Sequence, residues 1–260
     1  MAEGSQLRAW LVRLAMLAAG FFLLVGASCH TAPPPAPPQP EVSPPVTGNT
    51  AVPNTLTNAE RAAGWRLLFD GRTGAGWRGY RQAALPAGWQ VQDGALTRVG
   101  SGGDIITNDQ FKNFELALEW KIAPGGNSGI FYRASEDSDA IYWNAPEMQV
   151  LDDARHPDGQ SRLTSAGAAY GLYPAPAGVV KPANEWNAVR LIVNGNHVEH
   201  WLNGVKMVEY EFGSPDFQAK VKDSKFAPHP NFGKNAAGHI GLQDHGDLVA
   251  FRNIKIRVLP

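Results

Sequence analysis

The sequence predicts an all-β fold in which two antiparallel sheets pack as a sandwich or jelly roll. About a dozen short segments with strand signals follow one another from residue 67 onward. Few windows have helical periodicity, and Asx-Gly dipeptides separate several of the segments. Strands that succeed one another without intervening helices are typical of two-sheet antiparallel architectures.

Each predicted strand combines β-branched, aromatic or alternating residues with a turn-forming residue at its end. In chain order the predicted strands are 67–69, 89–92, 95–99, 105–107, 114–121, 129–133, 147–151, 186–193, 197–202, 206–212, 238–243 and 249–258. Adjacent residues that tolerate positive φ fit tight hairpin turns, which are predicted at Asp70-Gly71, Asp93-Gly94, Asn194-Gly195 and Asn203-Gly204. The only helical patterns are short ones, at 58–64 and 214–221.

The first 29 residues have the pattern of an export signal. Arg8 and Arg13 accompany an apolar run from Leu14 to Gly26, which is too short to span a bilayer comfortably. Cys29 is the single cysteine of the chain, which excludes an intramolecular disulfide. We expect Cys29 to be the lipid-modified first residue of an exported bacterial lipoprotein, with plain secretory cleavage as the alternative. By resemblance to known lipoproteins, His30 after the cysteine favours the outer membrane of the cell envelope.

Residues 30–58 are predicted to be a tether, because the prolines between residues 32 and 45 oppose helix and sheet pairing. Residues 59–260 form one predicted domain, which is long enough for a substantial core. The chain has 23 Lys and Arg against 24 Asp and Glu, a net charge of −1 at pH 7. Without a basic cluster there is no electrostatic footprint for nucleic acid. The oligomeric state stays open.

The most informative segment is the strand pattern that begins at Glu147. On a strand, Glu147 and Gln149 share one face while Met148 and Val150 share the other, so the polar pair can face a groove as the apolar pair enters the core. Asp152 has the wrong parity for the groove unless a β-bulge shifts it. A buried network of structural hydrogen bonds is the alternative interpretation.

A second groove strand is predicted near the C-terminus. Ile240 and Leu242 share one face, while His239, Gln243 and His245 share the other. When the sheets of a sandwich curve, the concave face forms a groove, and strands that cross it show apolar residues to the core and polar residues to the ligand. We therefore expect a concave ligand groove lined by both segments.

Several separated stretches resemble, in the right order, the 3-keto-disaccharide hydrolase domain family. They are Leu68-Phe69-Asp70-Gly71, Asn127-Ser128-Gly129-Ile130, Glu147-Met148-Gln149-Val150-Leu151-Asp152 with His156-Pro157-Asp158, Ala169-Tyr170-Gly171-Leu172-Tyr173, His200-Trp201-Leu202-Asn203-Gly204, Ser224-Lys225-Phe226, and Gly238 to Gly246 followed by Phe251-Arg252-Asn253-Ile254-Lys255. The resemblance runs from about Trp65 to Leu259. It implies a concanavalin A-like jelly roll, often exported or lipid-anchored, that acts on glycosides oxidised to a ketone at C3.

The chemistry that this resemblance implies is an elimination. A ketone at C3 acidifies the proton on C2, so a base can remove it, the C1 substituent leaves, and water can add back. Glu147 is the predicted base and Gln149 a predicted hydrogen-bond donor to a sugar oxygen. Asp152, His156 or His245 is a predicted acid or metal ligand, and the predicted catalytic residues are therefore Glu147, Gln149, Asp152 and His245.

A broader resemblance concerns the same strand. Laminarinase-type glycoside hydrolases carry the motif Glu-x-Asp-x-x-Glu, and this chain has Glu147-x-Gln149-x-x-Asp152. The glutamine and the shorter terminal acid depart from the ordinary retaining mechanism, which needs two carboxyl groups about 5 Å apart. A conventional glycoside hydrolase is therefore a less favoured alternative.

Further predictions concern binding, metal and structural residues. The substrate-binding candidates are Arg133, Trp143, Tyr132, His156, Gln243, Lys225 and His239. Trp143, just before the acidic strand, is the preferred platform for sugar stacking, although such aromatics are often core. Lys225 could instead be solvated, and Arg133 could pair with a carboxylate or end a strand in solvent. His200 is expected to be a satisfied interior histidine and Asp244 to bind backbone groups at a strand end.

A divalent cation is a candidate cofactor. Asp152, Asp153, His156 and His245 could hold one that polarises a ketone or enolate. An Asx-rich surface turn is the alternative. On balance the sequence favours a lipid-anchored enzyme that binds a small carbohydrate and cleaves 3-keto-glycosides. A non-catalytic carbohydrate-binding module of the same fold is a second hypothesis, and a structural or interaction domain on a cell-surface stalk is a third.

Overall fold

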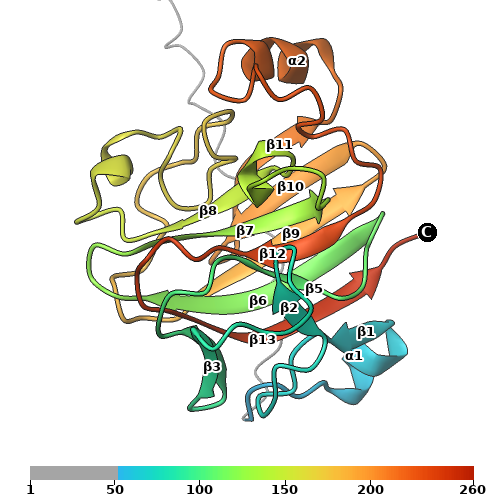
Figure 1. Cartoon of the computed structure of the whole chain (residues 1–260), viewed down its shortest axis with the longest axis vertical. Helices are drawn as coiled ribbons and strands as arrows, with labels where there is room; N and C mark the ends of the chain where they lie inside the picture. The colour runs from blue at the N-terminus through green and yellow to red at the C-terminus, as the bar shows by residue number, and fades with distance from the viewer. Residues whose placement is uncertain (1–51) are drawn as a thin grey trace, which may run out of the picture. The chain divides into compact units, whose positions relative to one another are not determined.

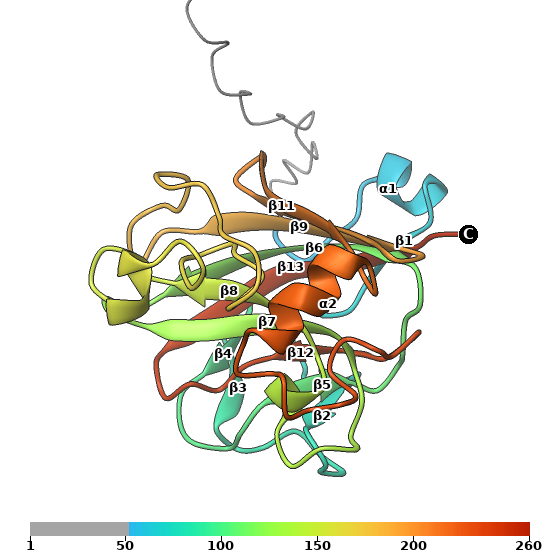
Figure 2. The same ribbon diagram turned by 90° about the horizontal axis from the view of Figure 1, so that it is seen from above.

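The computed structural model describes residues 52–260. These residues form two antiparallel sheets with few helices, which confirms the predicted sandwich (Figures 1 and 2). The predicted signal segment with Cys29 and the tether up to residue 51 lie outside the described residues. No helix within residues 52–260 combines the length and hydropathy that a membrane span requires.

The described part of the chain contains a larger and a smaller sheet. The larger sheet has the order β11 (Val205–Glu211), β10 (His197–Leu202), β9 (Asn187–Asn194), β6 (Phe114–Ile122), β13 (Val249–Val258), β4 (Ala95–Arg98) and β3 (Trp89–Gln92), and β1 (Trp65–Leu67) also pairs with β13. The smaller sheet has the order β2 (Trp77–Gly79), β5 (Ile105–Thr107), β12 (His239–Leu242), β7 (Asn127–Ala134) and β8 (Glu147–Leu151). The helices are α1 (Asn58–Ala62), α2 (Pro215–Lys222), η1 (Ile141–Trp143) and η2 (Pro157–Gln160), the last two of the 3₁₀ type.

All the predicted strands and both predicted helices are present, with small shifts at their ends. The strand β2, which has only three residues, was not predicted. Two of the four predicted hairpin turns have positive φ at both central residues, Asp93-Gly94 and Asn203-Gly204. Asn194-Gly195 joins β9 to β10, but Asp70-Gly71 joins strands of different sheets, so that hairpin prediction is wrong. The Asp70 carboxylate instead accepts hydrogen bonds from the following backbone N–H groups.

The folded domain begins before the predicted boundary at residue 59. Asn54 is buried and exchanges two hydrogen bonds with Asn253 of β13, from Asn54 N to Asn253 Oδ1 (2.6 Å) and from Asn253 N to Asn54 Oδ1 (2.8 Å). Thr57 and Glu60 then form a reciprocal capping box at the start of α1. The segment from Asn54 to Asn58 is therefore part of the domain rather than of a tether.

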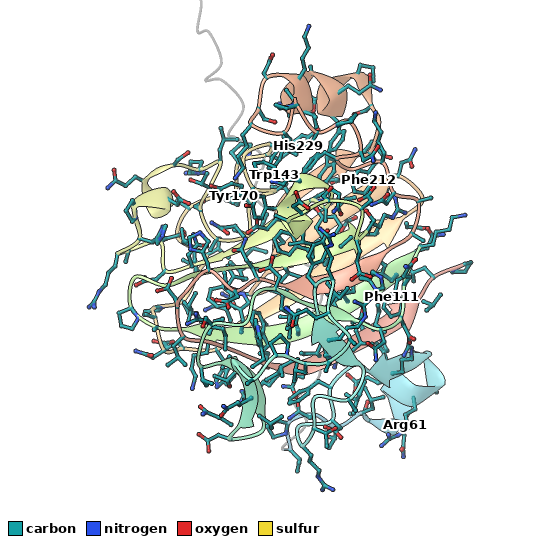
Figure 3. All side chains as sticks on the ribbon, in the orientation of Figure 1. Arg61, Phe111, Trp143, Tyr170, Phe212 and His229 are labelled. Carbon is teal, nitrogen blue, oxygen red and sulfur yellow. The ribbon has the colours of Figure 1, made fainter. Side chains whose placement is uncertain are left out.

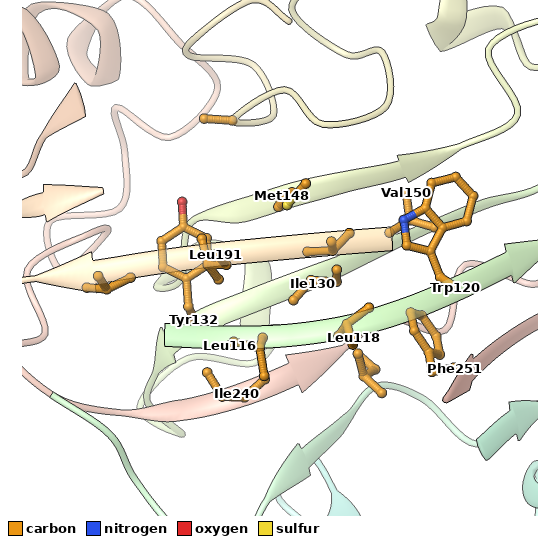
Figure 4. Packing of buried hydrophobic residues seen from close by; sticks show 14 of the residues in the cluster. Leu116, Leu118, Trp120, Ile130, Tyr132, Met148, Val150, Leu191, Ile240 and Phe251 are labelled. Carbon is orange, nitrogen blue, oxygen red and sulfur yellow. The ribbon is translucent and has the colours of Figure 1, made fainter. Parts of the chain in front are cut away.

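The main core lies between the two sheets (Figure 4). β6 contributes Leu116, Leu118 and Trp120, and the smaller sheet faces them with alternate residues of its strands. These facing residues include Ile130, Met148, Val150 and Ile240. The predicted alternation on β8 is thereby confirmed, since Met148 and Val150 enter the core.

The outer face of the smaller sheet divides into two halves. One half is covered by a second apolar cluster, formed by Ile106, Phe131, Ala134, Ile141 and Ala145, with Tyr80 and Tyr142 packed against it. In the other half, the strand β7 has a glycine, Gly129, at the position opposite Gln149 of β8. This half carries the polar residues described below.

A long segment, residues 152–186, follows β8 and covers its free edge (Figure 1). Gln149 N donates to Ala168 O at 3.1 Å, Gly167 N donates to Gln149 O at 2.9 Å, and Tyr170 N donates to Glu147 O at 3.0 Å. An edge strand exposes unpaired backbone groups, so this pairing satisfies them. It also fixes Tyr170 beside Glu147.

Candidate active site

A pocket of about 510 Å³ lies over the open half of the smaller sheet. We call it the β8 pocket. It is lined by Asn127, Tyr142, Trp143, Glu147, Gln149, Tyr170, Lys225, Gln243, Asp244 and His245. The structure thus brings together six residues singled out from sequence, namely Trp143, Glu147, Gln149, Lys225, Gln243 and His245.

Glu147 lies at the floor of the β8 pocket. A Cβ atom at position 129 would lie only 2.2 Å from Glu147 Oε1, so the carboxyl group occupies the space that Gly129 leaves empty. Within residues 52–260 no group donates a hydrogen bond to this carboxyl group. Burial raises its pKa to about 8, the nearby Lys225 lowers it, and Asp104 and Asp158 raise it further. A buried carboxyl group with so high a pKa is suited to proton transfer near neutral pH.

Three amide side chains surround Glu147. Gln149 is opposite Gly129 on β8, Asn127 precedes Gly129 by two residues on β7, and Gln243 donates its backbone N–H to the Gly129 carbonyl at 3.0 Å. The side-chain oxygens Asn127 Oδ1, Gln149 Oε1 and Gln243 Oε1 are buried, and no hydrogen-bond partner reaches them in the described part of the chain. The floor therefore presents several acceptor oxygens.

The sequence-based role of Gln149 as a donor needs correction. Gln149 Nε2 donates to the carbonyl oxygen of Thr164 at 3.1 Å, in the segment that covers the edge of β8. The group left without a partner is the side-chain oxygen, Gln149 Oε1. Gln149 therefore offers the pocket an acceptor.

The rim of the pocket is aromatic and cationic. Figure 3 labels two of its aromatic residues, Trp143 and Tyr170, together with His229. The exposed Lys225 ammonium lies 4.3 Å from the centroid of the Tyr170 ring and 5.8 Å from that of Tyr142. Trp143 stacks on His229 with ring centroids 4.0 Å apart, so one face of the predicted sugar platform is already covered. No carboxylate among residues 52–260 forms an ion pair with Lys225, which leaves its charge directed at the pocket.

One of the two predicted histidines borders the pocket. His245 is exposed and lines the pocket. The ring of His156 lies 6.4 Å from that of His245, but His156 Nδ1 accepts a hydrogen bond from Asp158 N and caps η2. His156 therefore stands behind His245, outside the lining of the pocket.

Arg133 does not reach the pocket because β7 contains a β-bulge. Two residues, Tyr132 and Arg133, stand opposite the single residue Ile240 of β12, and Arg133 has a φ of 53°. The bulge takes Arg133 off the pocket face. Its guanidinium donates instead to the carbonyl oxygens of Lys112 and Gly195. The prediction that it binds substrate does not fit this position.

Tyr132 belongs to the core. Its hydroxyl group lies 2.8 Å from His200 Nε2 and 2.6 Å from the hydroxyl of Tyr210. His200 is fully buried, donates from Nδ1 to the Gly167 carbonyl, and has its pKa lowered by burial to about 4. His200 is therefore the satisfied, neutral interior histidine that was predicted, and Tyr132 is one of its partners rather than a sugar-binding residue.

His239 is also held away from the pocket. It is buried, with Nδ1 2.7 Å from the Thr107 carbonyl oxygen and Nε2 3.1 Å from Gln110 Nε2. Although it shares strand parity with Gln243, it lies at the other end of β12, where its ring nitrogens are engaged with neighbouring residues. Strand parity places a residue on a face but does not say which end of that face is open.

Asp152 is a structural residue at the end of β8. The strand ends at Leu151, and no bulge interrupts its register with β7. The Asp152 carboxylate accepts hydrogen bonds from Gly125 N at 2.7 Å and Ala154 N at 3.3 Å, and it does not line the pocket. The predicted catalytic role of Asp152 is not supported, because its carboxylate is used to hold the adjoining loops.

The predicted metal ligands do not form a metal-binding cluster. Asp153 accepts a hydrogen bond from Ala166 N, while Asp152, His156 and His245 have the positions described above. Within residues 52–260, the one group of three His, Asp or Glu residues whose ligand atoms lie within 4.8 Å of one another is His197, Glu199 and Glu209, on β10 and β11. The Asx-rich turn is thus the better interpretation of the 153–159 segment.

Asp244 has the structural role that was expected. Its carboxylate accepts hydrogen bonds from Gly102 N, Gly103 N and Gly246 N and pairs with Arg98 at 2.6 Å. Burial would raise its pKa, but these partners lower it. Although Asp244 borders the pocket, its oxygens are engaged with the loops around it.

Asn127 and Tyr170 line the pocket but were not predicted from the sequence. The strand signal was placed at residue 129, two residues late, so the alternation that puts Asn127 on the face of Gly129 was not followed to its start. For Tyr170 no local signal exists, because a bridge between Ala169 and Met148 brings the segment to β8.

Comparisons with known proteins show the family of the chain. The family model of the 3-keto-alpha-glucoside-1,2-lyase-like domain matches residues 64–257. A 3-keto-disaccharide hydrolase of Bacteroides thetaiotaomicron is 38% identical over 230 residues, which cover 76% of this chain and 79% of that protein.

Solved structures agree as well. A crystal structure of a proposed glycosyl hydrolase from Parabacteroides distasonis is 34% identical, with a TM-score of 0.75 over 80% of this chain and 100% of that one. Another such protein of that organism is 26% identical, with a TM-score of 0.57 over 88% of this chain and 95% of that one. This chain therefore belongs to the 3-keto-alpha-glucoside-1,2-lyase-like domain family.

Proposed function

We propose that this protein cleaves 3-keto-glycosides by removing the proton from C2 with Glu147 as the base. Family membership and the 38% identical hydrolase support a glycoside-cleaving enzyme. The observation that carries the mechanism is the buried Glu147 carboxyl group, which has no hydrogen-bond donor among the described residues and a pKa raised to about 8. A base of this strength can abstract the acidified proton next to a ketone.

The reaction proceeds in balanced steps. Glu147 takes the proton from C2, and the electron pair of the broken C2–H bond forms an enolate whose charge rests on the C3 oxygen. The enolate then expels the group on C1, so that the C1–O bond breaks and a C1=C2 double bond forms. For net hydrolysis, water adds its hydroxyl group to C1 and a proton returns to C2.

Lys225 is the residue that stabilises the enolate. Its ammonium group lies at the pocket rim beside Tyr170. The positive charge of Lys225 lowers the pKa of Glu147, so it acts on the floor of the pocket. A cation that faces developing negative charge in a partly buried site is worth far more than one in bulk water. His245, which lines the same pocket, supplies a proton to the departing C1 oxygen.

A conventional retaining mechanism is disfavoured by the second acid. Among residues 52–260, Asp244 is the one carboxylate besides Glu147 that lines the pocket. The Asp244 carboxylate already binds Arg98 and three backbone N–H groups. A retaining enzyme needs a nucleophile and an acid about 5 Å apart around C1, and Asp244 is not free for either role.

The decisive experiment compares a 3-keto-glucoside with its unoxidised parent as substrates for the purified protein. We expect release of the C1 substituent from the keto-glucoside alone. Deuterium at C2 should slow the reaction, and solvent deuterium should enter C2 of the hydrated product. Cleavage of the unoxidised parent with equal efficiency would refute the elimination. So would the absence of both the rate effect of C2 deuteration and the entry of solvent deuterium at C2.

We also propose that the protein is an exported lipoprotein anchored through Cys29. The support is the charged and apolar leader that ends at this cysteine. Cell fractionation of a producing bacterium, with mass spectrometry of the N-terminal peptide, should find acylated Cys29 in the envelope membranes. Cys29→Ser should lose the modification, and an unmodified cysteine in the wild type would disprove the anchor.

A further inference from the structure

The β8 pocket holds buried amide oxygens at its floor and a cation at its rim. The buried floor carries the carbonyl oxygens of Asn127, Gln149 and Gln243, each without a partner among the described residues. The charged or titratable groups Lys225 and His245 lie at the exposed rim of the pocket. The buried unpaired oxygens therefore lie deep, and the cation lies at the mouth.

The orientation of Gln149 is fixed by the protein itself. Its Nε2 group donates to the Thr164 carbonyl at 3.1 Å. If the amide were rotated by 180°, two carbonyl oxygens would face each other and the hydrogen bond would be lost. Gln149 Oε1 must therefore point away from Thr164 with its acceptor capacity unused.

A buried acceptor without a partner is costly, and native proteins keep few of them. Three such oxygens line one pocket, from Asn127 on β7, Gln149 on β8 and Gln243 just beyond β12. A ligand that brings hydrogen-bond donors would satisfy all three. A ketone oxygen cannot do so because it only accepts.

We propose that Asn127, Gln149 and Gln243 form an acceptor floor that reads free hydroxyl groups of the sugar ring and so turns the ketone toward Lys225. This inference rests on the proposed function and assigns the substrate class, a pyranoside with unsubstituted ring hydroxyls beside its ketone. The floor is a specificity device: a ring whose hydroxyls are absent or substituted leaves buried oxygens unpaired. Sites built to bind a hydroxyl group reject analogues that lack it.

The test measures kcat/KM for methyl 3-keto-α-glucoside and for its 2-deoxy, 4-deoxy and 6-deoxy analogues. With the wild-type protein, at least one analogue should lose about 10- to 100-fold in kcat/KM. With Gln149→Met, which keeps the side-chain length but removes the oxygen, that penalty should shrink to within about threefold. Gln92→Met, at an exposed glutamine of β3, is the control and should keep the full penalty.

Two results would overturn the acceptor floor. One is equal turnover, within about threefold, of all four sugars by the wild type. The other is a deoxy penalty that persists unchanged in Asn127→Leu, Gln149→Met and Gln243→Met alike. Calorimetry with Mn²⁺ adds a third check, since tight metal binding that disappears in these variants would mean that the oxygens coordinate a cation.

Failure of the floor and failure of the proposed function give different results. If methyl 3-keto-α-glucoside is cleaved but the analogues are not distinguished, the function stands and the floor is wrong. If methyl 3-keto-α-glucoside is not cleaved, the dissociation constants of the same four sugars still test the floor. The wild type should then bind the discriminating analogue about 10-fold more weakly, and Gln149→Met should not.

Discussion

Gly129 and Phe131 lie two residues apart on the same face of β7, yet they create opposite surroundings. Phe131 stands opposite Glu147 in the register with β8 and fills the outer face as part of an apolar cluster. Gly129 stands opposite Gln149 and leaves a space that the Glu147 carboxyl group enters. One missing side chain separates a closed half of the sheet from an open one, and the open half holds the candidate base.

The two halves also differ in electrostatics. In the open half, burial without hydrogen-bond donors raises the pKa of Glu147 to about 8, and burial raises that of the neighbouring Asp104 to about 6. In the closed half, polar groups such as His239 are engaged by neighbours. Unsatisfied buried polar groups are costly, so their concentration in the open half indicates that a ligand binds there.

The largest expected effect comes from removing the charge of the open half. Glu147→Gln should lower kcat/KM on a 3-keto-glucoside by about 10³- to 10⁴-fold, because the base for C2 is lost. Glu185→Gln, an exposed carboxylate elsewhere, should leave kcat/KM unchanged. If Glu147→Gln kept more than a tenth of the activity, another group would have to be the base.

The same variant should become more stable. The pKa of Glu147 is about 8 in the folded protein against 4.5 ordinarily, so between these values the unfolded chain releases its proton first and wild-type stability falls as pH rises. Denaturant titrations should show Glu147→Gln more stable than wild type by about 2–5 kcal/mol at pH 8, with the difference vanishing near pH 4. Equal stability at pH 8 would contradict the burial cost assigned to this carboxyl group.

A matched pair of glycine variants tests the two halves directly. Gly129→Ala places a Cβ against Glu147 Oε1 and should lower kcat/KM by about 10²-fold, because a displacement of about 1 Å misplaces the base. Gly241→Ala, in the closed half, meets Ile141 Cδ1 at 2.6 Å. It should cost about 1–3 kcal/mol of stability and leave activity within about threefold. If Gly241→Ala lowered kcat/KM and Gly129→Ala did not, the reaction would take place in the closed half.

Lys225→Met should have a smaller effect with a distinctive pH dependence. The lost cation should lower kcat by about 10- to 100-fold. Because Lys225 lowers the pKa of Glu147, the rise of kcat/KM with pH, expected near pH 8 in the wild type, should move upward in the variant. Lys222→Met on α2 is the control. An unmoved pH profile would show that Lys225 does not act on Glu147.

The smallest effect on activity is expected in the closed half. His239→Gln removes a buried ring held by Thr107 and Gln110, so it should cost about 1–3 kcal/mol of stability. Its kcat/KM should remain within about threefold of the wild type. A loss above tenfold in a folded variant would mean that His239 acts in catalysis after all.

Much of the site was predictable from alternation alone. Glu147 and Gln149 face the pocket and Met148 and Val150 the core because a strand alternates its side chains regardless of its neighbours. Gln243 follows from the same rule. The rule fails for Arg133 because β7 contains a β-bulge. The bulge depends on how β7 pairs with β12, and the residues around Arg133 do not indicate it.

Other residues depend on segments that arrive from far along the chain. Tyr170 reaches Glu147 only because residues 167–170 pair with the edge of β8, and Lys225 comes from the segment after α2. Asp152 looked like a catalytic acid because of its spacing, but its carboxylate binds the loop at Gly125. Spacing along a strand carries no information on which loops need a hydrogen-bond acceptor.

The sequence by itself determined the strands, most of their ends, the two-sheet sandwich and the face on which Glu147 lies, since these depend on local propensity and periodicity. The tertiary structure decided which half of the outer face is open, which acceptors remain unpaired, and which distant cation and aromatic rings border the base. These depend on packing between strands and loops far apart in the chain. The sequence shows that residue 129 has no side chain. Only the tertiary structure shows that the Glu147 carboxyl group occupies the space which Gly129 leaves.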